Sequence, residues 1–88
     1  MRRRVVWQRR AANELAVITR QDARTAERIR AAVDHYADTG YGDVQKLRGE
    51  DDLYRLRVGN FRVIFEFEDG QLVIVVLRVR NRRDAYRD

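Results

Sequence analysis

The chain has 88 residues, 38% of them charged, and its 19 lysines and arginines outnumber its 14 acidic residues, giving a formal net charge of +5. This length supports one small domain, residues 1–88, with a single two-layer core. The absence of cysteine excludes disulfides and thiolate metal sites, and the single histidine, His35, excludes a histidine-cluster zinc site. We therefore expect neither metal nor cofactor.

The same sequence contains no apolar run of the roughly 20 residues that a membrane-spanning helix needs. Its N-terminal segment RRRVVW also lacks the apolar centre of a signal peptide. We therefore expect a cytoplasmic protein without a membrane partner. The positive charge favours a polyanion such as nucleic acid, or an acidic protein, as partner. All basic residues except Lys46 are arginine, which binds phosphate bidentately.

The first half of the chain predicts a strand followed by two helices. Val5, Val6 and Trp7 indicate a short strand at a sheet edge. In residues 9–20 and again after residue 22, apolar side chains recur at helical spacing. They are Ala12, Leu15, Ala16 and Ile18 in the first helix, and Ala26, Ile29, Ala32, Val33, Tyr36 and Ala37 in the second.

The two helices are closely linked in the sequence. Asp22 is a suitable N-cap for the second helix, because its carboxylate can accept backbone N–H bonds in the first turn. Gly40 provides a stop at the end of that helix. Two amphipathic helices with so short a link predict an antiparallel hairpin that covers one face of a sheet. Residues 41–52, with two glycines and an acidic run, are expected to form a loop.

The segment LYRLRVGNFRVIF, residues 53–65, predicts a β-hairpin. Apolar and basic residues alternate on both sides of Gly59-Asn60, which suits a tight two-residue turn. This turn would place Val58 opposite Phe61 and Arg57 opposite Arg62, with Arg55 on the same face as the two arginines. Like charges directly opposite each other destabilise a sheet by up to about 1 kcal/mol. Their presence here suggests a binding site for an anion.

Asp69-Gly70 indicates a second tight turn before a third strand. A two-residue loop there would place Ile64 opposite Val75 and Arg62 opposite Leu77. The arginines would then rise from an apolar floor, and the opposite face must be covered by the helices. That floor consists of Ile64, Val73, Val75 and Leu77; the covered face consists of Tyr54, Leu56, Val58, Phe61, Val63, Phe65, Phe67, Leu72, Ile74 and Val76.

After Val79 the chain is expected to leave the sheet. Asn81 can cap a turn of helix that would place Arg82 and Tyr86 on one face. The predicted fold is therefore α+β: a small antiparallel sheet with an N-terminal strand and a helical hairpin on one face, in the order β-α-α-β-β-β.

On these elements the chain resembles the RelE/ParE superfamily of bacterial type II toxins, in particular its RelE-like branch. The residues that carry the resemblance are the N-terminal strand and alanine-rich helical hairpin, KLRG at 46–49, YRLRVGNFRVI at 54–64, Arg82 and Tyr86-Arg87. It covers the whole chain. It implies an enzyme that cleaves mRNA on the ribosome without metal, inhibits translation and is neutralised by a cognate antitoxin.

The resemblance also assigns roles to particular residues. Basic groove positions correspond to Arg55 and Arg57, a phosphate-stabilising arginine to Arg62, a second catalytic arginine to Arg82 and an aromatic C-terminal residue to Tyr86. Lys46, Arg48 and Arg83 are further candidates for RNA binding. One position departs from the family, because Asn81 precedes Arg82 where many relatives have histidine, and asparagine cannot transfer a proton as imidazole does.

RNA cleavage without metal requires removal of the 2′-OH proton, stabilisation of the charge on the transition state and protonation of the leaving 5′ oxygen. Tyr86 is the candidate base, provided that guanidinium charge lowers its pKa, or else a surface on which an RNA base stacks. Arg62 and Arg82 are the candidate charge stabilisers. The sequence offers no obvious general acid, since arginine is a poor one.

Other interpretations remain open at this stage. The alternating arginines also fit a solvated strand face, and Arg82 and Tyr86 fit a frayed C-terminus. One alternative function is that of a ParE-like toxin that binds and poisons DNA gyrase, which needs no such catalytic site. Another is an inactive member that only binds its antitoxin.

Overall fold

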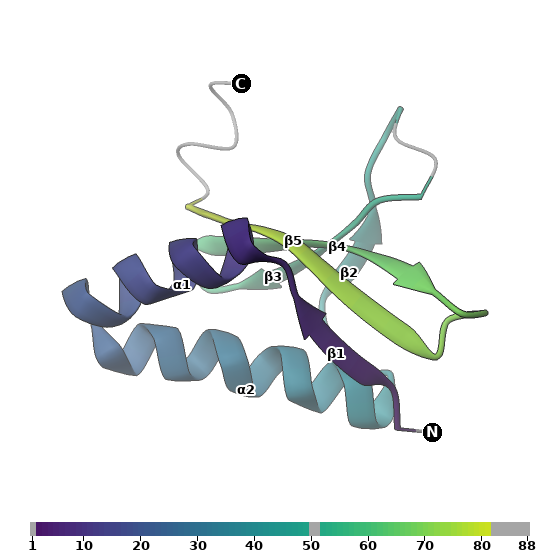
Figure 1. Cartoon of the computed structure of the whole chain (residues 1–88), viewed down its shortest axis with the longest axis horizontal. Coiled ribbons are helices and arrows are strands. Elements are labelled where there is room, and N and C mark those ends of the chain that lie inside the picture. The colour runs from purple at the N-terminus through teal and green to yellow at the C-terminus, as the bar shows by residue number, and fades with distance from the viewer. Residues whose placement is uncertain (1, 50–51, 82–88) are drawn as a thin grey trace.

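A computed structural model describes residues 2–49 and 52–81. The elements in chain order are β1 (Arg4–Trp7), α1 (Arg9–Gln21), α2 (Ala23–Thr39), β2 (Val44–Lys46), β3 (Tyr54–Val58), β4 (Phe61–Glu68) and β5 (Val73–Asn81). The two helices form one layer and the sheet forms the other (Figure 1). The expected α+β fold, with an N-terminal edge strand and a helical hairpin on one face, is confirmed.

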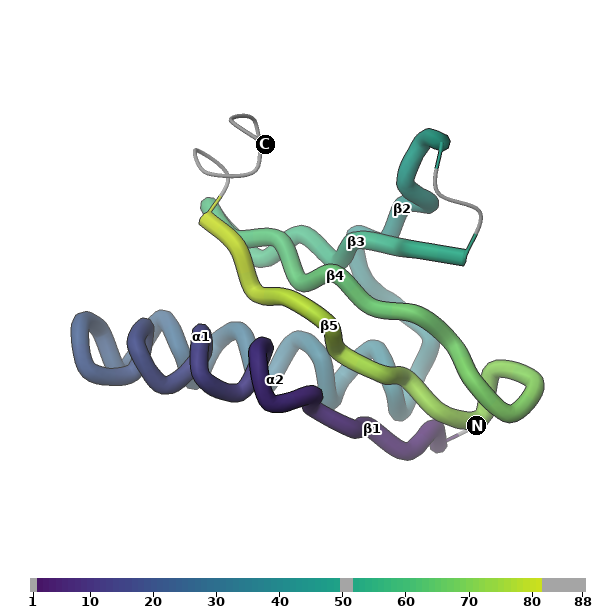
Figure 2. The backbone as a smooth tube through the Cα atoms, turned by 45° about the horizontal axis from the view of Figure 1, so that its top comes forward, coloured from purple at the N-terminus to yellow at the C-terminus, as the bar shows by residue number. Residues whose placement is uncertain are grey.

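The sheet differs from the expected one in two respects. Its strand order is β1-β5-β4-β3-β2, so it has five strands, because residues 44–46 form a short strand inside the region expected to be a loop. It is also mixed rather than antiparallel, because β1 pairs with β5 in parallel, whereas the other neighbours are antiparallel. Figure 2 shows β1 beside the first part of β5 only; the pairing runs from Arg4 opposite Val73 to Trp7 opposite Val76.

Local interactions fix the ends of α2 as the sequence predicts. The Asp22 carboxylate accepts hydrogen bonds from Thr25 N at 3.3 Å and from Thr25 Oγ1 at 2.7 Å. These bonds hold the pKa of Asp22 below its usual range. Gly40 ends the helix at φ 79°, a left-handed conformation that glycine adopts without strain. By contrast, α1 begins after Gln8 without a side-chain cap.

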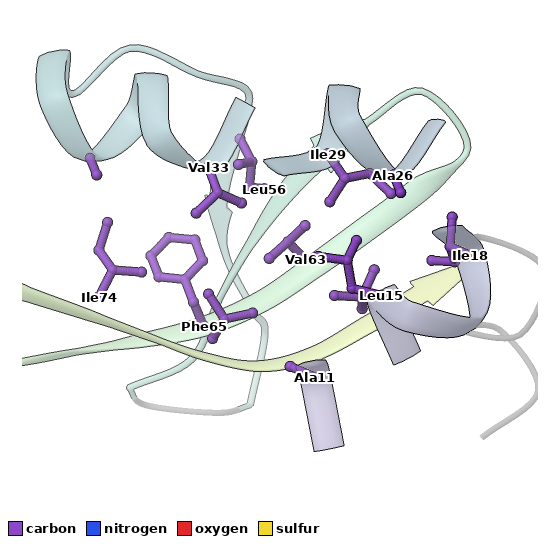
Figure 3. Packing of buried hydrophobic residues seen from close by; sticks show 13 residues of the cluster. Ala11, Leu15, Ile18, Ala26, Ile29, Val33, Leu56, Val63, Phe65 and Ile74 are labelled. Atoms are coloured by element: carbon purple, nitrogen blue, oxygen red, sulfur yellow. The ribbon is translucent and has the colours of Figure 1, made fainter. Parts of the chain in front are cut away.

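The core lies between the helical hairpin and the sheet (Figure 3). Phe65 is its largest fully buried side chain and packs against the rings of Tyr36, Tyr54 and Phe67, with centroids 5.4–5.7 Å apart. On α1 the buried residues are Ala11, Leu15 and Ile18, whereas the expected core positions Ala12 and Ala16 are exposed. Leu72, also expected on the covered face, is 46% exposed because it lies in a turn.

Arg3 anchors the N-terminal strand at the end of the core. Its guanidinium lies 5.6 Å from the ring centre of Tyr36 and 5.4 Å from that of Phe67, within the range of cation–π attraction. Its Nε also donates to the Gln71 carbonyl at 2.9 Å. Burial raises the pKa of Tyr36, and the charge of Arg3 partly opposes this effect.

None of the helices in the described residues is long and apolar enough to cross a membrane.

The second hairpin has a different register from the expected one. Asp69 (φ 51°) and Gln71 (φ 73°) both adopt positive φ, and the pairing of Glu68 with Val73 leaves a four-residue loop instead of two residues. A bulge then follows within the pairing, because Phe65 faces Val76 whereas its neighbour Ile64 faces Arg78.

The longer loop and this bulge together overturn the two predicted pairs. Ile64 faces Arg78 rather than Val75, and Arg62 faces Arg80 rather than Leu77. Leu77 becomes the extra residue of the bulge and has no partner on β4. It therefore does not lie opposite Arg62, where the sequence predicted it as part of the apolar floor.

Candidate nucleic-acid interface

Three arginines lie side by side across three neighbouring strands. Arg57 on β3 pairs directly with Arg62 on β4, as predicted, and Arg62 pairs directly with Arg80 on β5. We call these three residues the central row. Because neighbouring strands lie about 4.8 Å apart, the side chains of the central row start within roughly 10 Å of one another. Each is partly buried, and the Nε atom of Arg62 is shielded from solvent.

Two local features of the backbone produce the central row. The tight turn at Gly59 (φ 57°) sets the register that brings Arg57 opposite Arg62. The bulge at Leu77 then reverses the facing of the residues that follow it, so that Val79 enters the core and Arg80 points to the other face. The core residues Val63 and Val79 pair with each other, and the two arginines next to them therefore share the face away from the helices.

A second set of side chains lies beside the central row on the same face. Ile64 pairs with Arg55 on one side and Arg78 on the other. We call these three residues the flanking row. The Arg55 side chain is only 13% exposed. Its Nη1 donates to the carbonyl and carboxylate oxygens of Asp43, at 3.0 and 3.3 Å, and its Nη2 to Gln45 Oε1 at 2.7 Å.

Arg78, at the other end of the flanking row, binds a carboxylate from α1. Its Nε donates to Glu14 Oε2 at 3.0 Å, and its Nη2 forms an ion pair with the same oxygen at 2.9 Å. The other oxygen of the same carboxylate, Oε1, accepts from the Val79 backbone N–H at 2.8 Å. β1 pairs with β5 only as far as Val76, so Glu14 satisfies a donor on the strand edge beyond β1.

The other residues proposed from the sequence are placed differently. Lys46 pairs with Tyr54, whose ring packs in the aromatic cluster, so this register position belongs to the helix-covered side. Arg48 is exposed in a turn. Arg82, Arg83 and Tyr86, and the expected turn of helix after Asn81, lie outside the described residues. No group of three or more potential metal ligands occurs in residues 2–49 and 52–81.

Arg80 is the residue that sequence reasoning missed. The sequence contains a signal for it. Ile74 and Val76 face the core at even-numbered positions, whereas in Arg78-Val79-Arg80 the apolar residue stands at an odd-numbered position, so the alternation changes phase between them. The uniform apolar run of residues 73–77 conceals the change of phase.

A groove of about 400 Å³ lies next to Arg80, between α1 and the last residues of β5. Its lining includes Val17, Ile18 and Phe61.

Comparisons with known proteins agree with this fold. A family model described as "ParE toxin of type II toxin-antitoxin system, parDE" matches residues 5–86. A protein of Methanocaldococcus jannaschii with the provisional name toxin RelE1 is 33% identical over 46 residues. That match covers 52% of this chain and 51% of the relative, so the chain matches about half the length of this curated protein.

Two solved structures are similar over most of the chain. A toxin–antitoxin complex from Mycobacterium tuberculosis, RelBE2, has a chain with a TM-score of 0.77 and 20% identity; the match covers 93% of this chain and all of that one. An archaeal RelE–RelB complex from Pyrococcus horikoshii gives a TM-score of 0.62 and 28% identity, covering 93% and 97% of the two chains.

Proposed function

The chain belongs to the ParE toxin family of type II toxin–antitoxin systems, within the RelE/ParE superfamily, and on this premise we propose that it is a metal-independent endoribonuclease that cleaves mRNA on the ribosome. The observation that carries the proposal is the central row. It places three guanidinium groups on one face, and arginine binds phosphate oxygens in a bidentate manner. Clustered arginines of this kind are the footprint of a polyanion.

The proposed reaction is attack of a 2′-OH on the neighbouring phosphate. The 2′ oxygen forms a bond to phosphorus, the bond from phosphorus to the 5′ oxygen breaks, and the products carry a 2′,3′-cyclic phosphate and a 5′-OH. Arg62, at the centre of the row, is proposed to stabilise the negative charge that grows on the phosphate oxygens, with Arg57 and Arg80 on either side.

The remaining roles follow from the resemblance. Tyr86 is proposed as the base or stacking residue and Arg82 as a second charge stabiliser, with Arg48 and Arg83 in RNA binding. Arg55 contributes positive charge beside the row, although its hydrogen bonds to Asp43 and Gln45 also give it a structural role. The Mycobacterium tuberculosis relative forms a toxin–antitoxin complex, and we propose that a cognate antitoxin neutralises this chain too.

A second candidate function is the poisoning of DNA gyrase by protein binding. The observation in its favour is that the matching family model is named for the ParE toxin. A gyrase poison has no need of three arginines aligned across the sheet, so the two candidates differ in their dependence on the central row.

The experiment that tests the proposal is induction of this chain without antitoxin in a bacterial host, followed by primer extension on a well-translated message. We expect cuts within codons that disappear with Arg62→Ala. The matched control is Arg24→Ala, which removes an equal charge from an exposed position on α2 and should leave the cuts unchanged. Growth arrest with intact mRNA and with DNA breaks would instead establish the gyrase poison.

A further inference from the structure

Both arginines of the flanking row are held by carboxylates that come from outside strands β3, β4 and β5. Asp43, just before β2, binds Arg55, and Glu14 on α1 binds Arg78. The flanking row thus contains a carboxylate-bound arginine at each end and Ile64 in the middle.

The contact between Glu14 and Arg78 is tightly determined. Two nitrogens of the guanidinium contact one carboxylate oxygen, Nε by a hydrogen bond and Nη2 by an ion pair, and the backbone N–H of Val79 donates to the other oxygen. The side chains of Arg78 and Glu14 are 23% and 25% exposed, so the contact is partly shielded from solvent. Charge-assisted hydrogen bonds of this geometry are roughly twice as strong as neutral ones.

A phosphate that approaches Arg78 must therefore displace an anion that is already bound. Glu14 is part of the same folded chain, so its effective concentration at Arg78 is far above that of any polyanion in solution. Displacement would also leave the Val79 N–H without the acceptor that it now has.

We propose that Glu14 restricts the polyanion footprint of this face by holding Arg78 away from phosphates. Asp43 has the same effect on Arg55 at the opposite end of the flanking row. The inference deepens the proposed function, on which it rests, because it names the residues that decide how much of an arginine-rich face is available to RNA. Glu14 acts through Arg78 and touches no substrate.

The two carboxylates are expected to differ in importance. Glu14 Oε2 makes both contacts of the Arg78 guanidinium, the hydrogen bond from Nε and the ion pair with Nη2. Arg55 donates to three acceptor atoms. Two of them, the Asp43 carbonyl oxygen and Gln45 Oε1, are uncharged and remain after the substitution Asp43→Asn. Glu14→Gln should therefore release Arg78 more completely than Asp43→Asn releases Arg55.

The test is the salt dependence of binding to a 2′-deoxy 12-mer oligonucleotide, measured by fluorescence anisotropy. This probe carries the phosphates but cannot be cleaved by 2′-OH attack. The slope of log K against log[salt] reports the number of phosphate contacts, at about 0.7 for each contact with a single strand. Glu14→Gln should steepen the slope by about 0.7, because Arg78 becomes available.

Two comparisons separate this effect from a change in net charge. Glu27→Gln raises the net charge equally from an exposed position on α2 and should leave the slope unchanged. The double variant Glu14→Gln/Arg78→Ala should return to the slope of the unmodified chain. A Glu14→Gln slope equal to that of the unmodified chain, in a protein with a normal melting transition, overturns the proposal.

Arg78→Ala alone provides a test that does not depend on the Glu14 variant. The proposal expects its slope to equal that of the unmodified chain, because Arg78 makes no phosphate contact while Glu14 holds it. A slope shallower by about 0.7 would overturn the proposal. Failure of the proposed function would appear in a different experiment, as mRNA that stays intact on ribosomes. Binding of the uncleavable probe can be measured in either case.

Discussion

Arg62 on β4 lies directly opposite Arg80 on β5, while its other neighbour across the sheet is Arg57. Like charges at directly opposed positions destabilise a sheet, by about 0.2–1 kcal/mol for each pair. Two such pairs share Arg62. The fold therefore brings three positive charges together at this point, and the proposed binding of a phosphate depends on this arrangement.

Arg62→Met should separate stability from activity. Methionine keeps an apolar stem of similar length but removes the charge and with it the repulsion across the ladders, so the variant should still fold and melt cooperatively. Cleavage of mRNA should fall by about 100-fold to 1000-fold, the usual loss when one stabiliser of transition-state charge is removed. Thermal melting and the cleavage rate on ribosomes measure the two effects. A variant that melts much lower would show that Arg62 is mainly structural.

Glu14→Ala should lower the free energy of unfolding by about 1–3 kcal/mol, because the Val79 N–H and the Arg78 guanidinium both lose their acceptor. Glu14→Gln should cost less, since its amide oxygen can still accept from Val79. Urea unfolding compares the three proteins. Equal stability of the alanine and glutamine variants would contradict the importance of the Val79 bond.

Phe65→Ala should cost about 3–5 kcal/mol, because Phe65 is 2% exposed and contacts three other aromatic rings. That is a large share of the 5–15 kcal/mol typical of a small domain. The loss should appear as a lower urea midpoint. Val17→Ala, at a position that is 43% exposed, is the control and should change stability by less than about 0.5 kcal/mol.

Tyr36 should make stability depend on pH in the alkaline range. Burial raises its pKa in the folded state, so its contribution is fully present below the unfolded pKa of about 10 and is lost as the pH rises through the folded pKa. Tyr36→Phe removes this ionisation. Melting temperatures from pH 8 to pH 11.5 should fall less for the variant than for the unmodified chain. Tyr41→Phe, at a position 74% exposed, should not reduce the fall.

The first hairpin could be predicted from the sequence, but the second could not. Gly59-Asn60 defines a short turn, so the pairing of Arg57 with Arg62 followed from local residues. Asp69-Gly70 suggested an equally short turn, yet Gln71 also adopts positive φ and lengthens the loop. The bulge at Leu77 depends on the burial of Val79 beneath α1, a tertiary effect that local alternation does not report.

The same distinction applies to the candidate site. Arg55, Arg57 and Arg62 share a face, as alternation predicts. Arg80 joins them only through the bulge, and the carboxylates that hold Arg55 and Arg78 come from segments that are distant in sequence. Spacing along one strand carries no information on such partners. The parallel pairing of β1 with β5 likewise depends on the path of the whole chain.

The most direct measurement of the central claim is single-turnover cleavage of a defined mRNA on purified, programmed ribosomes. The account predicts cleavage that yields a 2′,3′-cyclic phosphate, that stops when the nucleotide before the cut is 2′-deoxy, and that falls at least 100-fold with Arg62→Met. Arg24→Ala should cleave at the unmodified rate. Cleavage of the 2′-deoxy message, or an Arg62→Met protein that cuts as fast as the unmodified chain, would contradict it.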